Sequence, residues 1–187
     1  IPVMNGMPYI KEAVGSALSG SISDIELIIS DNASDDGTSE FLGSLNDPRV
    51  IVITQPQRVS AAENWHRVTN AAIGQYVKLL CADDTISTDC LKNQIAAMTS
   101  DSNIVLVASK RKVVDDDGKT VLKSHGLLLL SGRVNGKRAI RNSVVTGTNQ
   151  FGEPASVLFK REVLFSCLPW DSKEPYVTDL DMYSKVL

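Results

Sequence analysis

Short apolar runs rich in β-branched residues alternate, through the first half of the chain, with stretches that repeat apolar residues at helical spacing. The apolar runs are residues 25–31, 49–55, 75–83 and 103–111. The helical stretches are residues 10–18, 37–45 and 60–74. Continuous apolar runs of this length are typical of strands buried on both faces. The alternation predicts an α/β fold with a mostly parallel central sheet, helices on both faces, and ligands beyond the carboxyl ends of the strands.

The pattern is less regular after residue 110. Residues 113–121 place an Asp-Gly dipeptide between valines, which predicts a hairpin, and a glycine-spaced segment follows to about residue 150. Residues 155–163 are expected to form a strand that runs into a helix, and another helix is expected from Thr178. Because no linker interrupts the 187 residues, we expect one domain, 1–187. The chain opens on "IPVM" and stops at "YSKVL" without a helix stop signal, so we expect truncation at both ends.

The composition narrows the class of protein. A hydrophobic content of 43% and a charged content of 22% are typical of a globular domain and not of a disordered one. The formal net charge of −3 provides no broad basic field, which argues against nucleic acid as a partner. Three widely spaced cysteines favour reduced thiols and a cytoplasmic location. With neither a signal peptide nor an apolar run of about 18 residues, we expect no membrane span in these residues.

Asp83 and Asp84 follow directly after the apolar run that begins at residue 75. Two adjacent like charges repel by roughly 1 to 4 kcal/mol, depending on the effective dielectric. A bound Mn²⁺ or Mg²⁺ would remove this repulsion, because carboxylate oxygens are the ligands these ions prefer. The alternative is that one aspartate caps a helix that starts near Ser87 while the other is solvated.

Asp31 and Asn32 end the first apolar run, and a helix is expected after Gly37. At the carboxyl end of a strand, these two side chains are placed to bind the base or ribose of a nucleotide. The alternative is that the same polar residues only form turns and helix caps.

Four segments of the chain are similar, in order and spacing, to blocks of family 2 glycosyltransferases. The segments are "NGMPYIKEAVGSAL", "IELIISDNASDDGT", "AAENWHRVTNAAIGQYVKLLCADD" and "GEPASVLFKRE". The resemblance spans nearly the whole chain and implies the GT-A (Rossmann-like) fold of inverting nucleotide-sugar enzymes (EC 2.4 class). It also implies that residues 1–110 bind the donor sugar nucleotide and that residues 111–187 form an acceptor half, incomplete at its C-terminus.

The resemblance carries several residues into the donor site. Asp84 would hold the metal in a DXD-like motif, with Asp83 nearer the ribose and Asp31 at the base and ribose. The remaining donor-site residues implied in this way are Pro2, Met4, Asn5, Arg58 and Asn64. For Arg58 the alternative is a solvated cation, and for Asn64 it is an amide on a helix surface. Family members carry an acidic residue where this chain has Asn32, so the preferred base stays open, with UDP favoured.

The family places its catalytic base at the start of a late helix, and "VTDLDMY" resembles that element. Asp179 would then take a proton from the acceptor hydroxyl. Thr178 stands where glutamate is common in the family, and Asp181 is a second choice for the base. The alternative is that both aspartates only interact with the positive end of the helix dipole.

Two further residues are candidates for the acceptor side. Glu153 could meet a sugar hydroxyl, or it could belong to a simple Gly-Glu-Pro turn. Trp170 could offer an apolar ring face to a sugar, or it could be buried in a protein with few aromatic residues.

Together these observations predict a metal-dependent inverting glycosyltransferase, bacterial, acting in polysaccharide or cell-envelope biosynthesis. It would move a sugar from a nucleotide diphosphate donor to a glycan or lipid-linked acceptor. The alternatives are a nucleotidyltransferase and a non-catalytic nucleotide-sugar-binding domain. The expected location is cytoplasmic, with membrane association left open for the full-length protein.

Overall fold

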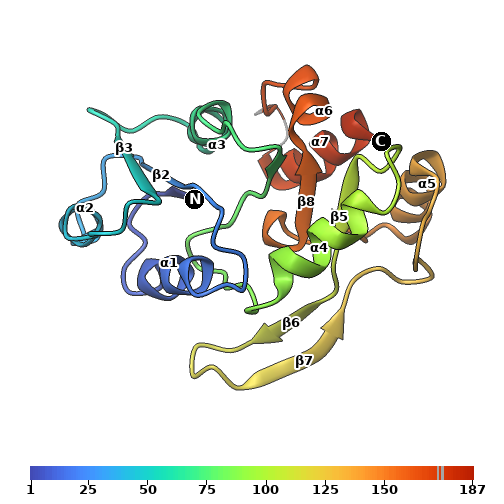
Figure 1. The fold of residues 1–187 in the computed structure, drawn as a ribbon, viewed down its shortest axis with the longest axis horizontal. Coiled ribbons are helices and arrows are strands. Elements are labelled where there is room, and N and C mark those ends of the chain that lie inside the picture. Colours follow the sequence, from blue (N-terminus) through green and yellow to red (C-terminus); the bar gives the residue numbers. More distant parts are fainter. Residues whose placement is uncertain (172, 174) are drawn as a thin grey trace.

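The computed structural model describes residues 1–171, 173 and 175–187. Its first half contains a three-stranded parallel sheet of order β1-β2-β3, formed by β1 (Pro2–Val3), β2 (Leu27–Asp31) and β3 (Val50–Thr54). The helices of this half are α1 (Ile10–Leu18), α2 (Thr38–Gly43) and α3 (Ala61–Asn70). Figure 1 shows α1 and α3 on opposite sides of these strands.

Side chains of β2 alternate between two hydrophobic clusters. Leu27 and Ile29 pack with Ile10 and Val14 of α1, whereas Ile28 packs in the cluster that contains Val68 of α3. Because successive side chains of a strand point to opposite faces, both faces of β2 are covered by helices. This arrangement confirms the predicted α/β fold with helices on both faces.

The second half is built on a small antiparallel sheet of order β4-β8-β5. Its strands are β4 (Tyr76–Val77), β5 (Leu106–Ala108) and β8 (Val157–Lys160). The strands expected over 75–83 and 103–111 are therefore shorter than predicted and both pair with β8, not with the parallel sheet. A continuous apolar run shows that a strand is buried on both faces but does not identify its partner.

The remaining helices cover this second sheet. They are α4 (Cys90–Thr99), α5 (Gly136–Thr146), α6 (Arg161–Ser166) and α7 (Thr178–Val186), with short 3₁₀ turns at Pro154–Ser156 and Pro175–Val177. The sequence predicted a strand running into a helix over 155–163, which is β8 followed by α6, and a helix start at Thr178, but it predicted no helix over 136–146. No helix among the described residues has the length and apolar character needed to cross a bilayer.

A hairpin of β6 (Arg111–Val114) and β7 (Thr120–His125) projects from the body of the molecule (Figure 1). Its turn closes with a hydrogen bond of 2.9 Å from the Gly118 N–H to the Asp115 carbonyl, and Gly118 has a φ of +74°. Glycine adopts this left-handed conformation without steric cost. The Asp-Gly hairpin prediction is confirmed.

Candidate active site

The loops after β1 and β2 are joined by a network of polar side chains. Asn5 and Asp35 exchange hydrogen bonds of 2.8 and 2.9 Å, and the Asn5 N–H donates to Ser34 Oγ at 2.8 Å. Arg58 reaches the same group through an ion pair of 2.8 Å with Asp35. Arg58 is thus a paired cation beside the loops that follow β1 and β2. Met4 is half exposed, and Pro2 is buried within β1.

Asp31 and Asn32 are both almost fully buried at the carboxyl end of β2. The Asp31 carboxylate accepts from the Ser34 N–H at 3.2 Å and from the Ser39 hydroxyl, so it fixes the turn into α2. The Asn32 amide donates to the Val59 carbonyl at 2.9 Å and accepts from the Val59 N–H at 2.8 Å. These are the contacts of the turn-and-cap alternative, and a base contact for either residue stays a prediction.

Asn64 lies inside the protein, contrary to both sequence interpretations. Its Oδ1 accepts from Ser30 Oγ at 2.6 Å, and its Nδ2 donates to the Ser30 carbonyl at 3.1 Å. With only 3% of its surface exposed, Asn64 ties α3 to β2. The burial of Asn64 argues against its assignment as a donor contact, and its hydrogen bonds to Ser30 support β2 beneath the predicted donor loop.

Asp83 and Asp84 lie in a turn after the β4 segment, closed by a 3.2 Å hydrogen bond from the Asp84 N–H to the Cys81 carbonyl. Ligand atoms of Cys81, Asp83 and Asp84 all lie within 4.8 Å of one another. Helix α4 begins only at Cys90 and its N-cap residue is Asp89. The alternative in which one aspartate of the pair caps this helix is therefore wrong.

Burial, with the negative charges of Asp83 and Glu153, raises the pKa of Asp84 to about 6. Burial and the negative charges of Asp84 and Asp83 raise the pKa of the Cys81 thiol to about 12. A thiol that stays protonated is a poor ligand, whereas two carboxylates suit a hard divalent cation. The ligand atoms present therefore fit Mn²⁺ or Mg²⁺ bound by Asp84 and Asp83. A bound cation would relieve the electrostatic repulsion at Asp84.

Asp179 is held in the first turn of α7 by two hydrogen bonds. Its Oδ1 accepts from the Leu180 N–H and its Oδ2 accepts from Asn149 Nδ2, each at 2.7 Å. Burial raises the pKa of Asp179, and the charge of Glu153 adds to the shift. Asp181, in contrast, makes an ion pair of 2.5 Å with Lys185 along the same helix. Of the two candidates, Asp179 is the one coupled to the other acids.

Glu153 interacts electrostatically with both Asp84 and Asp179. Its carboxylate is paired with the Arg111 guanidinium, including a 3.2 Å hydrogen bond from Nη2. Its charge raises the pKa of both Asp84 and Asp179, so carboxyls from three distant segments interact electrostatically. The ion pair with Arg111 supplies a structural role for Glu153, and contact with an acceptor sugar stays a prediction.

Sequence reasoning missed Asn149 and Arg111. Asn149 Oδ1 accepts from the N–H groups of Phe151 and Gly152, which locks the amide that holds Asp179. Asn149 and Asp179 are 30 residues apart in the chain, and nothing in the local pattern joins them. The glycine-spaced run up to Glu153 was a signal for a tight turn, but not for its partner.

Trp170 is buried in the core with only 4% of its surface exposed. Its ring meets Trp65 edge-on at 5.3 Å between centroids, and its Nε1 donates to Thr69 Oγ1 at 3.1 Å. Trp170 is therefore a core residue that joins α3 to the second half, and the proposed sugar contact is wrong.

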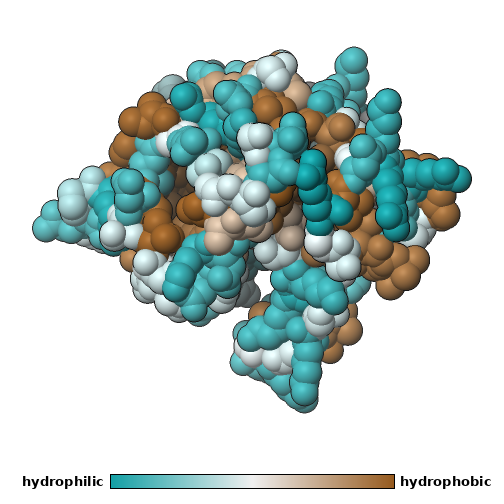
Figure 2. Space-filling model, turned by 45° about the vertical axis from the view of Figure 1, so that its right-hand side comes forward, coloured by the Kyte–Doolittle hydropathy of each residue, from teal (hydrophilic) through white to brown (hydrophobic). Residues whose placement is uncertain are grey.

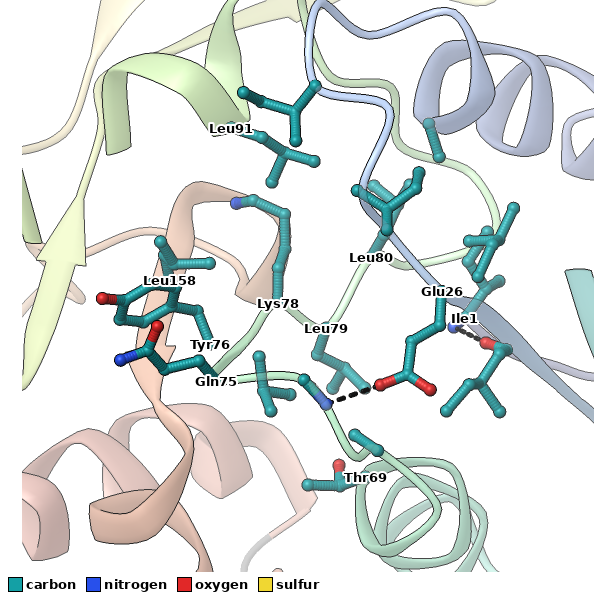
Figure 3. Close-up of a pocket in the computed structure, with 18 of the residues that line it drawn as sticks. Ile1, Glu26, Thr69, Gln75, Tyr76, Lys78, Leu79, Leu80, Leu91 and Leu158 are labelled. Carbon is teal, nitrogen blue, oxygen red and sulfur yellow. Dashed lines mark hydrogen bonds between the residues drawn. The ribbon is translucent and has the colours of Figure 1, made fainter. Parts of the chain in front are cut away.

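A cavity of about 720 Å³ has none of the acidic residues Asp83, Asp84, Glu153 and Asp179 in its walls. Figure 3 shows residues that line it. Its walls include Ile1, Leu27, Tyr76 and Leu80, and Glu26 accepts from the Gly74 N–H at 2.7 Å beside it. Leu27 and Tyr76 begin β2 and β4, so the cavity lies toward the amino ends of these strands. Because ligands of such folds bind at the carboxyl ends, we place the active site at the acidic cluster and not in this cavity.

A half-parallel α/β fold with paired aspartates after one strand, and a further carboxylate at a late helix start, defines the GT-A class of glycosyltransferases. The sequence profile described as "Glycosyl transferase family 2" matches residues 1–165. The chain belongs to this family, which confirms the resemblance.

Relatives and solved structures agree with this assignment. The chain is 28% identical over 128 residues to a chondroitin synthase of Pasteurella multocida (strain Pm70), covering 67% of this chain and 13% of that protein. It is 33% identical over 101 residues to the Escherichia coli "UDP-Glc:alpha-D-GlcNAc-diphosphoundecaprenol beta-1,3-glucosyltransferase WfaP", covering 54% of this chain and 40% of that protein. This chain thus spans less than half of these two relatives.

Two structural neighbours share the fold at low identity. One is S. aureus TarS 1-349 in complex with UDP-GlcNAc, with a TM-score of 0.73 and 17% identity over 98% of this chain and 52% of that one. Another is the mannosyltransferase PcManGT from Pyrobaculum calidifontis in complex with GDP-Man and Mn²⁺, with a TM-score of 0.63 and 17% identity over 92% of this chain and 46% of that one.

Proposed function

We propose that this chain forms the donor-binding and catalytic part of a metal-dependent, inverting glycosyltransferase. Its donor is a nucleotide diphosphate sugar, with UDP favoured, and its acceptor is a glycan or lipid-linked hydroxyl. The observation that carries the proposal is the pair Asp83 and Asp84 in one turn, with ligand atoms within 4.8 Å of one another. The charge of Glu153 couples this pair to Asp179, because it raises the pKa of both Asp84 and Asp179. The names of the two relatives, a chondroitin synthase and a glucosyltransferase, support glycosyl over nucleotidyl transfer.

In this proposal the residues divide the chemistry between them. Asp84 and Asp83 would hold Mn²⁺ or Mg²⁺, and the ion would supply positive charge to neutralise the departing diphosphate. The acceptor oxygen bonds to the anomeric carbon as the bond to the diphosphate breaks, and Asp179 takes the acceptor proton. The raised pKa of Asp179 makes it a stronger base than a solvated aspartate, which suits that role.

Calorimetric titration with UDP, GDP and CDP, each with and without Mn²⁺, tests the donor site. We expect binding that requires the metal, is strongest for UDP, and is weakened at least about tenfold by Asp84→Ala, since a metal ligand is lost. Asp89→Ala is the matched control, because it removes an exposed aspartate at the N-cap of α4 and should leave affinity unchanged. Metal-independent binding, or equal losses in the two variants, would contradict the proposal.

A further inference from the structure

Helix α5 turns a basic and aliphatic face to the outside. At 3.6 residues per turn, one side of the helix collects the exposed side chains Lys137, Arg138, Arg141, Val144 and Val145. The opposite side carries Ala139 and Ser143, which are buried. The helix thus packs on the protein through a narrow inner face and exposes an outer face of cationic and aliphatic side chains.

Charge in this region has a single sign, although the whole chain has a formal net charge of −3. No aspartate or glutamate occurs between Asp117 and Glu153. The cations in that interval are Lys119, Lys123, Arg133, Lys137, Arg138 and Arg141. Arg133 pairs with Asp101, whereas no ion pair found among the described residues involves a cation of α5. These three charges are available to an external anion.

Exposed aliphatic side chains lie at the C-terminal end of the same helix. Leu129 is 82% exposed and Val145 is 75% exposed, and Leu128 and Val144 are also exposed. The segment that carries the leucines is tied to α5, because Asn142 Nδ2 donates to the Leu128 carbonyl at 2.7 Å. We call the outer face of α5 together with Leu128 and Leu129 the α5 surface.

The backbone on either side of Leu128 adopts an unfavourable conformation. Leu127 and Leu129 have φ angles of +55° and +59°, in the left-handed region that bulky residues rarely adopt. Gln150 fixes this backbone, since its carbonyl and its side-chain Oε1 accept the N–H groups of Leu127 and Leu128, each at 2.8 Å. Figure 2 shows long hydrophilic side chains beside hydrophobic ones on the side of the molecule where α5 lies.

We propose that the α5 surface docks on an anionic lipid bilayer. Lysine and arginine are attracted to acidic headgroups. Neighbouring aliphatic side chains strengthen binding when they leave water for the boundary between headgroups and acyl chains. A second copy of the chain fits less well, because a symmetric interface would oppose like charges. Single-stranded nucleic acid is bound through aromatic stacking platforms, and this surface has only aliphatic residues.

The position of this surface suits the site. Arg111 begins the hairpin that leads toward Leu128, and Asn149 follows α5 and holds Asp179. The segments on either side of the α5 surface in the chain therefore also reach the candidate site. Docking in this way would bring the candidate site close to a lipid-anchored acceptor. The docking itself does not depend on the proposed function.

Vesicle flotation tests the inference on the 187-residue chain. The probes are vesicles of phosphatidylcholine alone and of phosphatidylcholine with phosphatidylglycerol in equal parts. We expect binding to the anionic vesicles only, weakened by added salt. Lys137→Glu with Arg141→Glu should lower the partition coefficient at least about tenfold, because two cations are lost and two anions that the headgroups repel take their place.

Two further variants sharpen the test. Lys11→Glu with Lys92→Glu makes the same charge change on exposed residues of α1 and α4 and should reduce binding much less. Leu128→Ser with Leu129→Asn should also weaken binding, and asparagine tolerates the positive φ at position 129. Circular dichroism checks that each variant is folded.

Equal losses from the two charge-reversal variants would overturn the proposal, as would equal binding to both vesicle types or no binding to either. Tighter binding to a DNA oligonucleotide than to anionic vesicles, lost in the same variants, would also overturn it in favour of a nucleic-acid surface. Self-association that is lost in the leucine variant, without vesicle binding, would overturn it in favour of a second copy. These outcomes concern the α5 surface and leave the donor titration unaffected.

Discussion

At the residue scale, negative charge accumulates around Asp84. In the folded chain its pKa is about 6, against an ordinary value of 3.8, because burial and the neighbouring acids disfavour its charged form. Between these two pH values the folded chain keeps a proton that the unfolded chain has lost. Stability therefore falls as the pH rises from about 4 to about 6.

Asp84→Asn should remove this pH-dependent loss. We expect the free energy of unfolding of the metal-free chain at pH 7 to rise by about 1 to 2 kcal/mol, after discounting the pKa shift for partial solvent exposure. At pH 4 the variant and the parent should differ little. Urea unfolding at the two pH values measures both, and a gain of equal size at each pH would refute the electrostatic explanation.

The same charge sets a limit for metal binding. Protonated Asp84 is a poor ligand, so affinity for Mn²⁺ with UDP should drop as the pH falls below about 6, where Asp84 takes up a proton. Calorimetric titrations at several pH values above and below this point measure the dependence. Affinity that is constant across that range would show that Asp84 does not hold the ion.

Asn149 is the residue we expect to support Asp179 without touching substrate. Its hydrogen bond favours the charged carboxylate, so Asn149→Ala should raise the pKa of Asp179 beyond its already raised value. Carbon-13 NMR of labelled aspartate carboxyls measures this pKa, and Asp179→Asn assigns its signal. An unchanged pKa in Asn149→Ala would remove Asn149 from this role.

Transfer assays with a full-length homologue test the base separately. The substitution equivalent to Asp179→Asn should lower turnover about a hundred- to ten-thousand-fold while donor binding is retained. Full turnover in that variant would exclude Asp179 as the base, whatever the result for Asn149.

At the element scale, the turn before β8 is shaped by close packing on Arg111. Gly152 has a φ of +90°, and a Cβ added there would lie 2.6 Å from Arg111 Nη1. Gly132 has a φ of +63° but open space around it, so it is a matched control. Gly152→Ala should destabilise the chain by about 2 kcal/mol or more and Gly132→Ala by about 1 kcal/mol. Equal losses in urea unfolding would show that packing on Arg111 adds nothing.

Elements differ in how well the sequence predicted them. Strand β2, helix α1, helix α3 and the hairpin have clear hydrophobic periods or an Asp-Gly turn, and each was found. Helix α5 was missed because valines and cations share its outer face, so its apolar residues do not mark an inner side. The pairing of β4 and β5 with β8 was also missed, since partner choice depends on contacts between residues 49 to 84 positions apart.

The candidate site was predicted only in part, because contacts between distant segments cannot be seen in local sequence patterns. Asp83, Asp84 and Asp179 stand in recognisable local patterns, but Asn149 and Arg111 act only through contacts made by the folded chain. Trp170 and Asn64 were misplaced because sequence alone does not show which side of a helix or loop faces the core.

At the scale of the whole molecule, residues 1–110 and 111–187 share a hydrophobic core. One cluster joins Ile28 and Val68 from the first half to Phe159, Trp170 and Met182 from the second. We therefore expect one cooperative unfolding transition, with tryptophan fluorescence and far-ultraviolet circular dichroism coinciding. Two separate transitions would show that residues 1–110 and 111–187 fold as independent units.

Trp170 tests this shared core directly. Trp170→Ala should cost about 3 to 5 kcal/mol of unfolding free energy, because it empties a packed site between the two halves. Tyr176→Ala is the control, since that side chain is 99% exposed and its loss should be nearly neutral. A stable Trp170→Ala variant would place the ring outside the core.

The most direct test of the whole interpretation is anomalous diffraction from crystals of this chain grown with UDP and Mn²⁺. We predict a manganese peak bonded to a carboxylate oxygen of Asp84, on the same side of the molecule as Asp179. Bound UDP with manganese elsewhere, or with Asp83 and Asp84 turned away from the diphosphate, would contradict the account.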